Sequence, residues 1–441
     1  MIDEPEQIPP NRPSMIGRLR TLAIDLSPLR ESRQFRLLFI GETVSDLGSE
    51  ITAVAVPFQV YELTHSPLAV GLLALCELGP IMVLPILGGA IADAVERRRL
   101  LRLVYAVLPI LSLGLALNAR LAAPHLWVLY VFATLGAAGY GLYSPAARSI
   151  PPLLFPQERL PSVFALISTY YSAVALAGPA LAGLLIGTIG LTATFLVDVG
   201  SFLVALVTLS MMRPVPKVRE ESEVSLESIV EGLRFLRGKR VLQSTFTVDL
   251  NAMIFGMPQA LFPAFAARMH QGPKVLGLFY AAPYAGSLLV TLLSGRVKDV
   301  RRQGLAVETS VVIWGVAIVA FGLSRSLWTA LLSLAVAGGA DMWSGIFRTS
   351  IGQAITPDEM RGRMSGIELA VVATGPTLGN LEAGVVGSLV SVPFSIILGG
   401  LACVAGVGAL ALLVPEFHRF DARASTAADE PGSSDDPPRD L

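Results

Sequence analysis

Twelve apolar stretches of about 20 or more residues run through this 441-residue chain and constrain its fold more than any other feature. A helix rises about 1.5 Å per residue, so roughly 20 residues cross the hydrocarbon of a bilayer. Charged residues make up only 15% of the sequence, too few to coat a soluble fold of this size. The sequence therefore predicts an all-α membrane protein with 12 transmembrane helices. The predicted spans are 35–61, 68–92, 100–119, 126–149, 160–187, 192–212, 241–267, 275–297, 304–324, 328–353, 363–388 and 393–414.

Positive charges are distributed unevenly between alternate loops. The loops on one side hold only four of the 33 Lys and Arg residues, namely Arg120, Arg268, Lys274 and Arg325. Basic residues stay on the cytoplasmic side of a membrane during insertion. We therefore expect a multi-pass protein of the cell inner (plasma) membrane with both termini in the cytoplasm. Residues 1–34 contain arginines and no long apolar run, so no cleavable signal peptide is expected.

A polar interruption at residues 213–240 divides the spans six and six. Its apolar residues recur at helical spacing among charged ones, which predicts an amphipathic helix on the inner membrane surface. The last segment is rich in Asp, Ser and Pro, a composition typical of disorder. The predicted domains are a cytosolic tail (1–34), an N-terminal six-helix bundle (35–212), the linker (213–240), a C-terminal six-helix bundle (241–414) and a disordered tail (415–441).

The two halves are related in sequence. At one offset of 206 residues, Gly71 matches Gly277, Gly89 matches Gly295, and Asp93 matches Asp299. A chance alignment would not keep its register over this distance. Parallel repeats of this kind place a transport site between two halves near the bilayer midplane.

The loop after the second predicted span contains a glycine, an acid and a run of arginines. It reads Gly89-Ala-Ile-Ala-Asp93-Ala-Val-Glu-Arg97-Arg98-Arg99. Gly89 permits close helix approach, and Asp93 can pair with loop arginines or face a helix N-terminus. The pattern resembles the cytoplasmic signature of the major facilitator superfamily, in which such contacts latch the inner gate. Ordinary positive-inside arginines are the alternative. A weaker second copy consists of Gly295, Asp299, Arg301 and Arg302, and its register argues against that alternative.

The fifth span contains the segment Gly178-Pro179-Ala-Leu-Ala-Gly183. Proline removes a backbone hydrogen bond and glycine lets a neighbour approach, so we expect a bend with close packing. The segment resembles part of the Gly-Pro motif of exporters in this superfamily, although Val174 occupies the place of an earlier glycine. It therefore favours efflux over uptake.

The whole chain resembles the enterobactin-exporter branch of the superfamily. The resemblance is carried by Gln59 and Tyr61 before Thr64-His65-Ser66-Pro67, by Gly277-Leu-Phe-Tyr-Ala-Ala, and by Thr356-Pro357-Asp358-Glu359. It implies the major facilitator-type fold, with two pseudo-symmetric bundles. Related members of the branch are drug efflux pumps, so the resemblance implies a siderophore-like or drug-like substrate and a place in multidrug resistance.

The first span carries three carboxylates, Glu42, Asp46 and Glu50, on one stripe about 80° wide. Charge in hydrocarbon costs a few kcal/mol, so we expect the stripe to face a cavity. Asp46 lies nearest the midplane and is the predicted proton-binding group, because desolvation and acidic neighbours favour its protonated form. Glu42 and Glu50 lie nearer the two surfaces, where a structural role is equally open. Asp249 and Asp341 are secondary candidates for the cavity.

Aromatic residues in three spans could line a pocket for a flat organic substrate. The candidates are Tyr140, Tyr143, Tyr280, Tyr284, Trp343 and Phe347. Packing or lipid contact is the more common role for such residues, and it remains the alternative here.

Other classes of function find little support in the sequence. There is no H-E-x-x-H motif, cysteine pair or phosphate-binding loop, so we expect no metal, no cofactor, no enzymatic activity and no ATP-driven pumping. The net charge of −1 gives no reason to expect nucleic acid binding. The sequence predicts a monomeric secondary transporter in the lipid bilayer that exports a small molecule by alternating access and proton antiport. A proton-coupled importer and a non-transporting membrane receptor remain alternatives.

Overall fold

The computed structural model describes residues 25–214, 226–294 and 300–421, and the regular structure within these ranges is helical. The first half contains α2 (Ser27–Glu31), α3 (Arg33–Thr64), α4 (Pro67–Ala94), α5 (Arg97–Arg120), α6 (Leu126–Arg148), α7 (Pro151–Leu154), η1 (Gln157–Arg159) and α8 (Leu160–Met211). The second half contains α9 (Leu226–Leu236), α10 (Arg240–Gly256), η2 (Gln259–Leu261), α11 (Phe262–Arg268), α12 (Pro273–Leu293), α13 (Gln303–Leu323), α14 (Leu327–Ile355), η4 (Asp358–Met360), α15 (Arg361–Leu389), α16 (Val392–Leu413) and α17 (Pro415–His418).

Ten helical segments of the described chain are long and apolar enough to cross a membrane. One of them, Gln157–Met211, has 55 residues and is interrupted at Gly190, whose φ of 79° is left-handed. This break lies in the gap between the fifth and sixth predicted spans. The 32-residue α3 is long enough to cross but more polar, since it carries Glu42, Asp46 and Glu50. These observations are compatible with twelve crossings.

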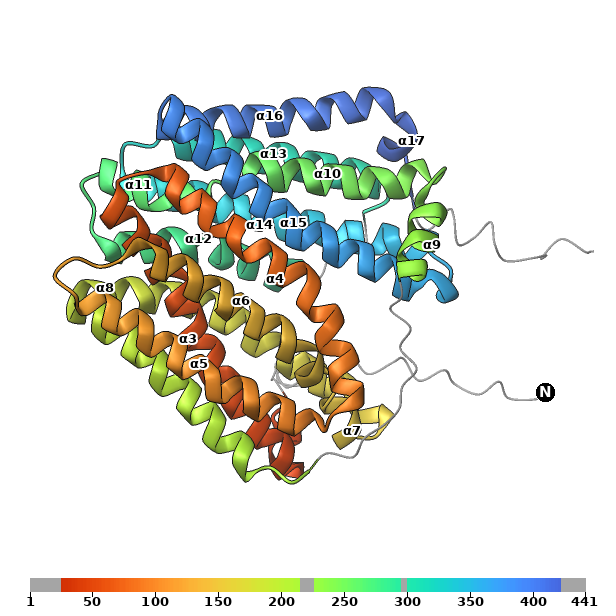
Figure 1. Ribbon diagram of the computed structural model, residues 1–441. Helices are drawn as coiled ribbons and strands as arrows, with labels where there is room; N and C mark the ends of the chain where they lie inside the picture. Colours follow the sequence, from red (N-terminus) through yellow and green to blue (C-terminus); the bar gives the residue numbers. More distant parts are fainter. Residues whose placement is uncertain (1–24, 215–225, 295–299, 422–441) are drawn as a thin grey trace, which may run out of the picture.

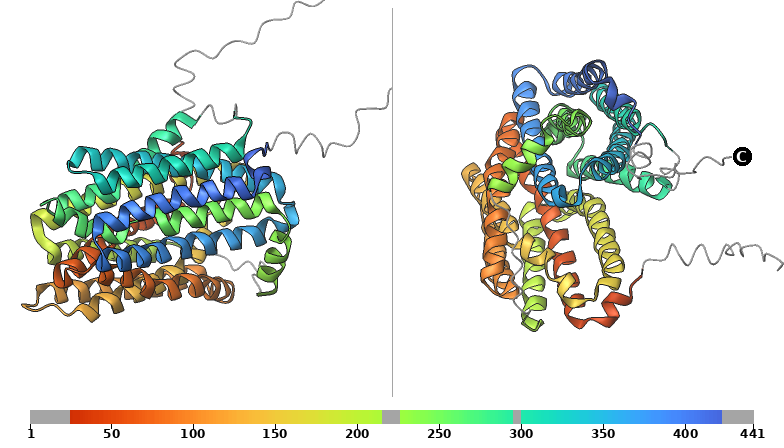
Figure 2. Two further views of the ribbon diagram at one scale, coloured as in Figure 1. Left: turned by 90° about the horizontal axis from the view of Figure 1, so that it is seen from above. Right: turned by 90° about the vertical axis from the view of Figure 1, so that its right-hand side faces the viewer.

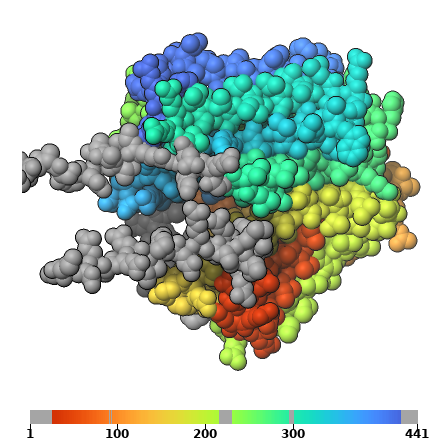
Figure 3. Space-filling model, turned by 180° about the vertical axis from the view of Figure 1, so that it is seen from behind, coloured from red at the N-terminus to blue at the C-terminus, as the bar shows by residue number. Residues whose placement is uncertain are grey.

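The long helices form two bundles, which we call the N-terminal bundle (α3 to α6 and α8) and the C-terminal bundle (α10 to α16). They lie one above the other in Figure 1 and appear as two groups in the right-hand view of Figure 2. The bundles meet along two pairs of helices, α4 with α15 and α8 with α12. Figure 3 shows the second contact from behind, with yellow α8 against teal α12.

The bundles approach most closely at one end of the helices, which we call the hairpin end because short turns such as His65–Ser66 and Val390–Ser391 lie there. A Cβ at Gly384 would lie 2.8 Å from the Pro67 carbonyl oxygen, and one at Gly183 would lie 2.6 Å from that of Pro273. The opposite end carries α7 and α9, and we call it the linker end. There, a Cβ at Gly89 or Gly366 would have no neighbour within 4 Å.

The predicted linker helix is present as α9, which packs against the linker end of α15. Glu231 forms an ion pair with Arg363 at 2.9 Å, and Gly232 faces Ile367. Val230 is exposed on the other side. This arrangement leaves an apolar side of α9 free to contact the membrane surface.

The disorder predicted from residue 415 is wrong for the first part of that tail. Pro415–His418 form α17, and Phe417 is completely buried. His418 Nδ1 lies 2.7 Å from Glu308 Oε2, and the Gln303 N–H donates to the Phe420 carbonyl at 3.1 Å. The predicted start of the disordered tail was too early, because the buried aromatic side chain of Phe417 holds an otherwise polar segment against the C-terminal bundle. Residues 422–441 lie outside the described residues.

Candidate functional site

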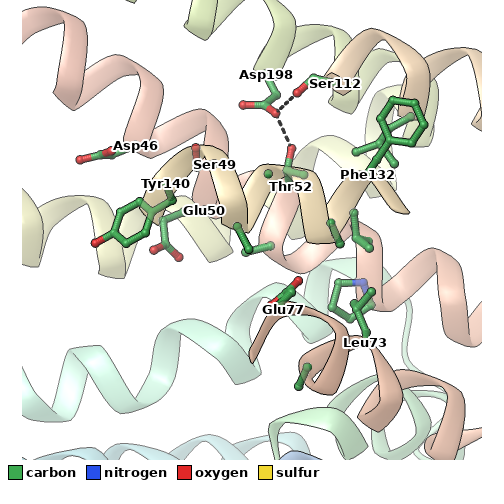
Figure 4. Close-up of a pocket in the computed structure, with 18 of the residues that line it drawn as sticks. Asp46, Ser49, Glu50, Thr52, Leu73, Glu77, Ser112, Phe132, Tyr140 and Asp198 are labelled. Carbon is green, nitrogen blue, oxygen red and sulfur yellow. Dashed lines mark hydrogen bonds between the residues drawn. The ribbon is translucent and has the colours of Figure 1, made fainter. Parts of the chain in front are cut away.

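A cavity of about 680 Å³ lies between the two bundles. Helices α3, α4, α5, α6 and α8 supply most of its lining, so the N-terminal bundle forms most of the wall. The C-terminal bundle contributes Gln259, Ala260, Tyr280 and Asn380. A volume of this size is typical of sites for small organic molecules. Figure 4 shows the polar side chains around it.

Four carboxylates line the cavity: Asp46, Glu50, Glu77 and Asp198. No Lys, Arg or His among the described residues belongs to the lining. Asp46 and Glu50 belong to the predicted stripe on α3. The sequence alone assigns no role to Glu77 or Asp198, although a lone acid in an apolar helix is a signal that could have found them.

Asp46 lies beside a group of tyrosines. The Tyr170 hydroxyl donates to Asp46 Oδ2 at 3.3 Å, and Tyr170 stacks on Tyr171 with ring centroids 4.4 Å apart. Glu42, one turn away, is not part of the cavity lining, and its Oε1 is buried without a hydrogen-bond partner in the described chain. Arg148 lies close enough to interact electrostatically with both acids, but it donates to the Tyr140 hydroxyl at 3.4 Å.

Asp198 is held by hydroxyl groups from three helices. It accepts hydrogen bonds from Thr52 at 2.8 Å, from Ser112 at 2.6 Å and from Ser201 at 3.3 Å. The first two appear as dashed lines in Figure 4. Only 1% of the residue is exposed, so this network satisfies a buried polar group and ties α3, α5 and α8 together.

The glycines of the Gly178-Pro179 segment lie at two close contacts. Gly178 faces Glu50, because a Cβ at Gly178 would overlap Glu50 Cβ. Gly183 faces Gly277 of α12, whose Cα would lie 2.9 Å from an added Cβ. Pro179 is buried beside them. The segment therefore connects one cavity acid to the contact between the bundles.

The two predicted acids of the C-terminal bundle lie outside the cavity lining. Asp249 forms an ion pair with Arg348, and Asp341 Oδ1 lies 3.8 Å from Arg348 Nη2. The Arg348 side chain is only 16% exposed. Arg348 thus neutralises acids of the C-terminal bundle. The cavity carboxylates of the N-terminal bundle, by contrast, have no ion-pair partner in the described chain.

The aromatic candidates divide into two groups. Tyr140, Tyr143 and Tyr280 line the cavity, whereas Tyr284, Trp343 and Phe347 do not. Phe347 is completely buried, and Trp343 packs edge-on against it with centroids 5.5 Å apart. The lining also includes three aromatic residues that the sequence does not single out: Phe132, Tyr171 and Phe202.

The arginines of the gate motif bind backbone carbonyls of their own bundle. Arg97 donates to the Ser149 carbonyl at 3.4 Å, and Arg98 donates to those of Leu209 and Ser210 at 3.0 and 2.7 Å. Gly89 and Asp93 lie in the last turns of α4, and the Asp93 side chain is outside the described part of the structure. In the second copy, Arg301 and Arg302 are exposed at the start of α13, and Gly295 and Asp299 lie outside the described residues.

Comparison with known proteins identifies relatives over almost the whole chain. A family profile described as transmembrane secretion effector matches residues 23–436. The enterobactin exporter EntS of Citrobacter koseri is 28% identical over 400 residues, covering 90% of this chain and 95% of the relative. EntS of Shigella boydii serotype 18 is 29% identical over 401 residues, with the same coverage.

Solved transporter structures share the fold. A bacterial homolog to the human lysosomal transporter Spinster aligns with a TM-score of 0.67 at 16% identity, covering 91% of this chain and 98% of that one. A bacterial homologue of the iron transporter ferroportin aligns with a TM-score of 0.63 at 17% identity, covering 88% and 99%. The predicted all-α, major facilitator-type fold is therefore confirmed.

Proposed function

Since the chain belongs to the transmembrane secretion effector family of the major facilitator superfamily, we propose that it exports a siderophore-like or drug-like organic molecule by proton antiport. The chain is a multi-pass membrane transporter and not an enzyme. The observation that carries the proposal is the cavity between the bundles, whose acids have no ion-pair partner in the described chain. A single chain would be the transporting unit.

The distribution of basic residues supports an orientation with the linker end in the cytoplasm. In this orientation the close glycine contacts of α4 with α15 and of α8 with α12 close the outer side. The cytoplasmic halves of the same helices lack such contacts at Gly89 and Gly366. The structure then corresponds to the form that takes up substrate from the cytoplasm, and rocking of the bundles would expose the cavity outside.

Asp46 is the group that we propose to carry the proton, with Glu42 or Glu50 sharing it. Desolvation disfavours a charged carboxylate inside the membrane, and Glu42 and Glu50 lie one turn away on either side. The Tyr170 hydroxyl donates a hydrogen bond to Asp46, and Asp46 forms no ion pair with a Lys or Arg of the described chain. A proton bound from the outside and released to the cytoplasm would supply the free energy for export.

Efflux from cells that express the protein tests this function. A fluorescent cationic dye and a catecholate siderophore would be loaded, and their loss measured with and without a protonophore. Asp46→Asn should abolish gradient-driven efflux at normal membrane insertion. Glu62→Gln is the matched control, because Glu62 is an exposed acid on the same helix. An efflux rate that the protonophore does not change would contradict proton coupling. So would an efflux rate of the Asp46→Asn variant equal to that of the wild type. If the wild type exported neither the dye nor the siderophore, the proposed export function would be contradicted.

A further inference from the structure

We propose that the cavity selects lipophilic cations and that Glu77 is the residue that recognises their positive charge. This inference rests on the proposed function, because it names the substrate class of the same cavity. It assigns a specificity-determining role to a side chain on α4, separate from the proton-binding stripe on α3.

The charge of the cavity lining points to a cation. Four carboxylates face the cavity, and no basic side chain of the described chain lines it. An anionic substrate would be desolvated beside these acids with no basic side chain in the lining to pair with it, which is costly in a membrane interior. A cation would gain an ion pair there and relieve repulsion between the acids.

Glu77 and Glu50 are the two cavity acids that form no hydrogen bond or ion pair with a described residue. Asp198 accepts three hydroxyl donors, and Asp46 accepts one from Tyr170. Glu50 lies on the proton stripe with its stem against Gly178. Glu77 is in the middle of α4 and points into the cavity across from Glu50 (Figure 4). An unpartnered carboxylate in this position is free to bind a ligand.

The surroundings of Glu77 suit an aromatic or alkyl cation better than a small hydrated one. Leu73, Ile81 and Phe132 line the cavity with it, and so do Tyr140 and Tyr171. Aromatic faces attract cations, most strongly where water is excluded. The site therefore combines one fixed negative charge with an apolar, aromatic wall.

Glu77 also lies on the helix that links the two bundles. Helix α4 packs along α15, whose Asn380 lines the same cavity and accepts a hydrogen bond from the Ala260 N–H at 2.9 Å. Gln259 and Tyr280 of the C-terminal bundle line the cavity as well. A cation held by Glu77 would thus contact both bundles, as a substrate must if its binding is to be linked to their movement.

Equilibrium binding to the purified full-length protein tests the inference without any gradient. The probes are tetraphenylphosphonium, a permanent cation, and triphenylphosphine oxide, a neutral molecule with the same aryl groups. The wild type should bind the cation more tightly. Glu77→Gln should weaken binding of the cation by about tenfold, as expected for the loss of one partly desolvated ion pair, and leave the neutral probe unchanged. Glu77→Asp should restore much of the affinity for the cation.

Glu382→Gln is the matched control, because Glu382 is a partly buried acid on α15 outside the cavity lining. Its affinity for the cation should equal that of the wild type. Equal binding of both probes by the wild type, or wild-type affinity of Glu77→Gln for the cation, would overturn the inference. A protein that binds the cation selectively but exports nothing would instead overturn the proposed function and leave this inference in place.

Discussion

The side chain of Glu50 on α3 lies in the space that the missing side chain of Gly178 leaves on α8. The two residues come from different spans, and each was notable in the sequence for a separate reason, one as an intramembrane acid and the other as part of a bend. Their contact joins these features. The Gly178-Pro179 segment makes room for a cavity carboxylate as well as bending a helix.

Gly178→Ala should therefore impair transport through Glu50. The new methyl group would overlap Glu50 Cβ, so either the carboxylate or the α3–α8 packing must shift. We expect efflux to fall by about tenfold or more, because misplacing a functional group by about 1 Å can cost roughly a hundredfold in rate. The measurement is the initial rate of efflux, normalised to the amount of inserted protein.

Gly200→Ala is the control for this variant, because Gly200 lies on α8 beyond the break at Gly190 and an added Cβ would meet no atom within 4 Å. It should transport like the wild type. If the Gly178→Ala variant transported as fast as the wild type, the contact between Gly178 and Glu50 would not be needed for transport.

Arg348 should be essential for stability because it balances the charge of Asp249. Arg348→Met would leave the Asp249 carboxylate without its ion-pair partner in a site where that side chain is only 9% exposed. Breaking a buried pair by removing one partner typically costs about 3–5 kcal/mol. We expect a lower thermal unfolding temperature in detergent, measured by the loss of monodisperse protein.

The double variant Arg348→Met with Asp249→Asn should recover part of this loss, since it removes both charges. Arg301→Met is the control, because Arg301 is exposed. A single Arg348→Met variant as stable as the wild type would show that the ion pair contributes nothing to the fold.

The sequence predicts the features that depend on local patterns and misses those that depend on contacts between distant helices. Apolar length and loop charge predict the spans, and the interruption near residue 190 appears as a left-handed Gly190. The stripe on α3 follows from spacing alone. The pairing of Asp249 with Arg348 does not, because residues about one hundred positions apart meet only in the packed bundle. The role that we propose for Glu77 does not follow from the sequence either, because it depends on which residues line the cavity with it.

The tail after residue 414 shows a further limit. Its composition is typical of disorder, yet Phe417 is buried and His418 contacts Glu308 on α13. Average composition over a segment cannot reveal one aromatic anchor at its start.

The close contact between Gly384 of α15 and α4 should control which end of the protein is closed. A valine at position 384 would place its Cβ 2.8 Å from the Pro67 carbonyl oxygen and 3.2 Å from Gly71 Cα, both on α4. Because backbone atoms cannot yield as a flexible side chain does, the helices must separate at the hairpin end. Gly384→Val should therefore shift the population toward the form that is open at that end and slow transport.

Spin labels at positions 62 and 325, which lie at the hairpin end of the two bundles, would report this shift as a longer mean distance between the labels. Gly366→Val is the matched control on the same helix, because a Cβ there has no neighbour within 4 Å, and its distance distribution should match that of the wild type. An unchanged distribution in Gly384→Val would mean that α4 and α15 absorb the side chain locally. Closure of the hairpin end would then depend on the α8–α12 contact at Gly183 and Gly277 instead.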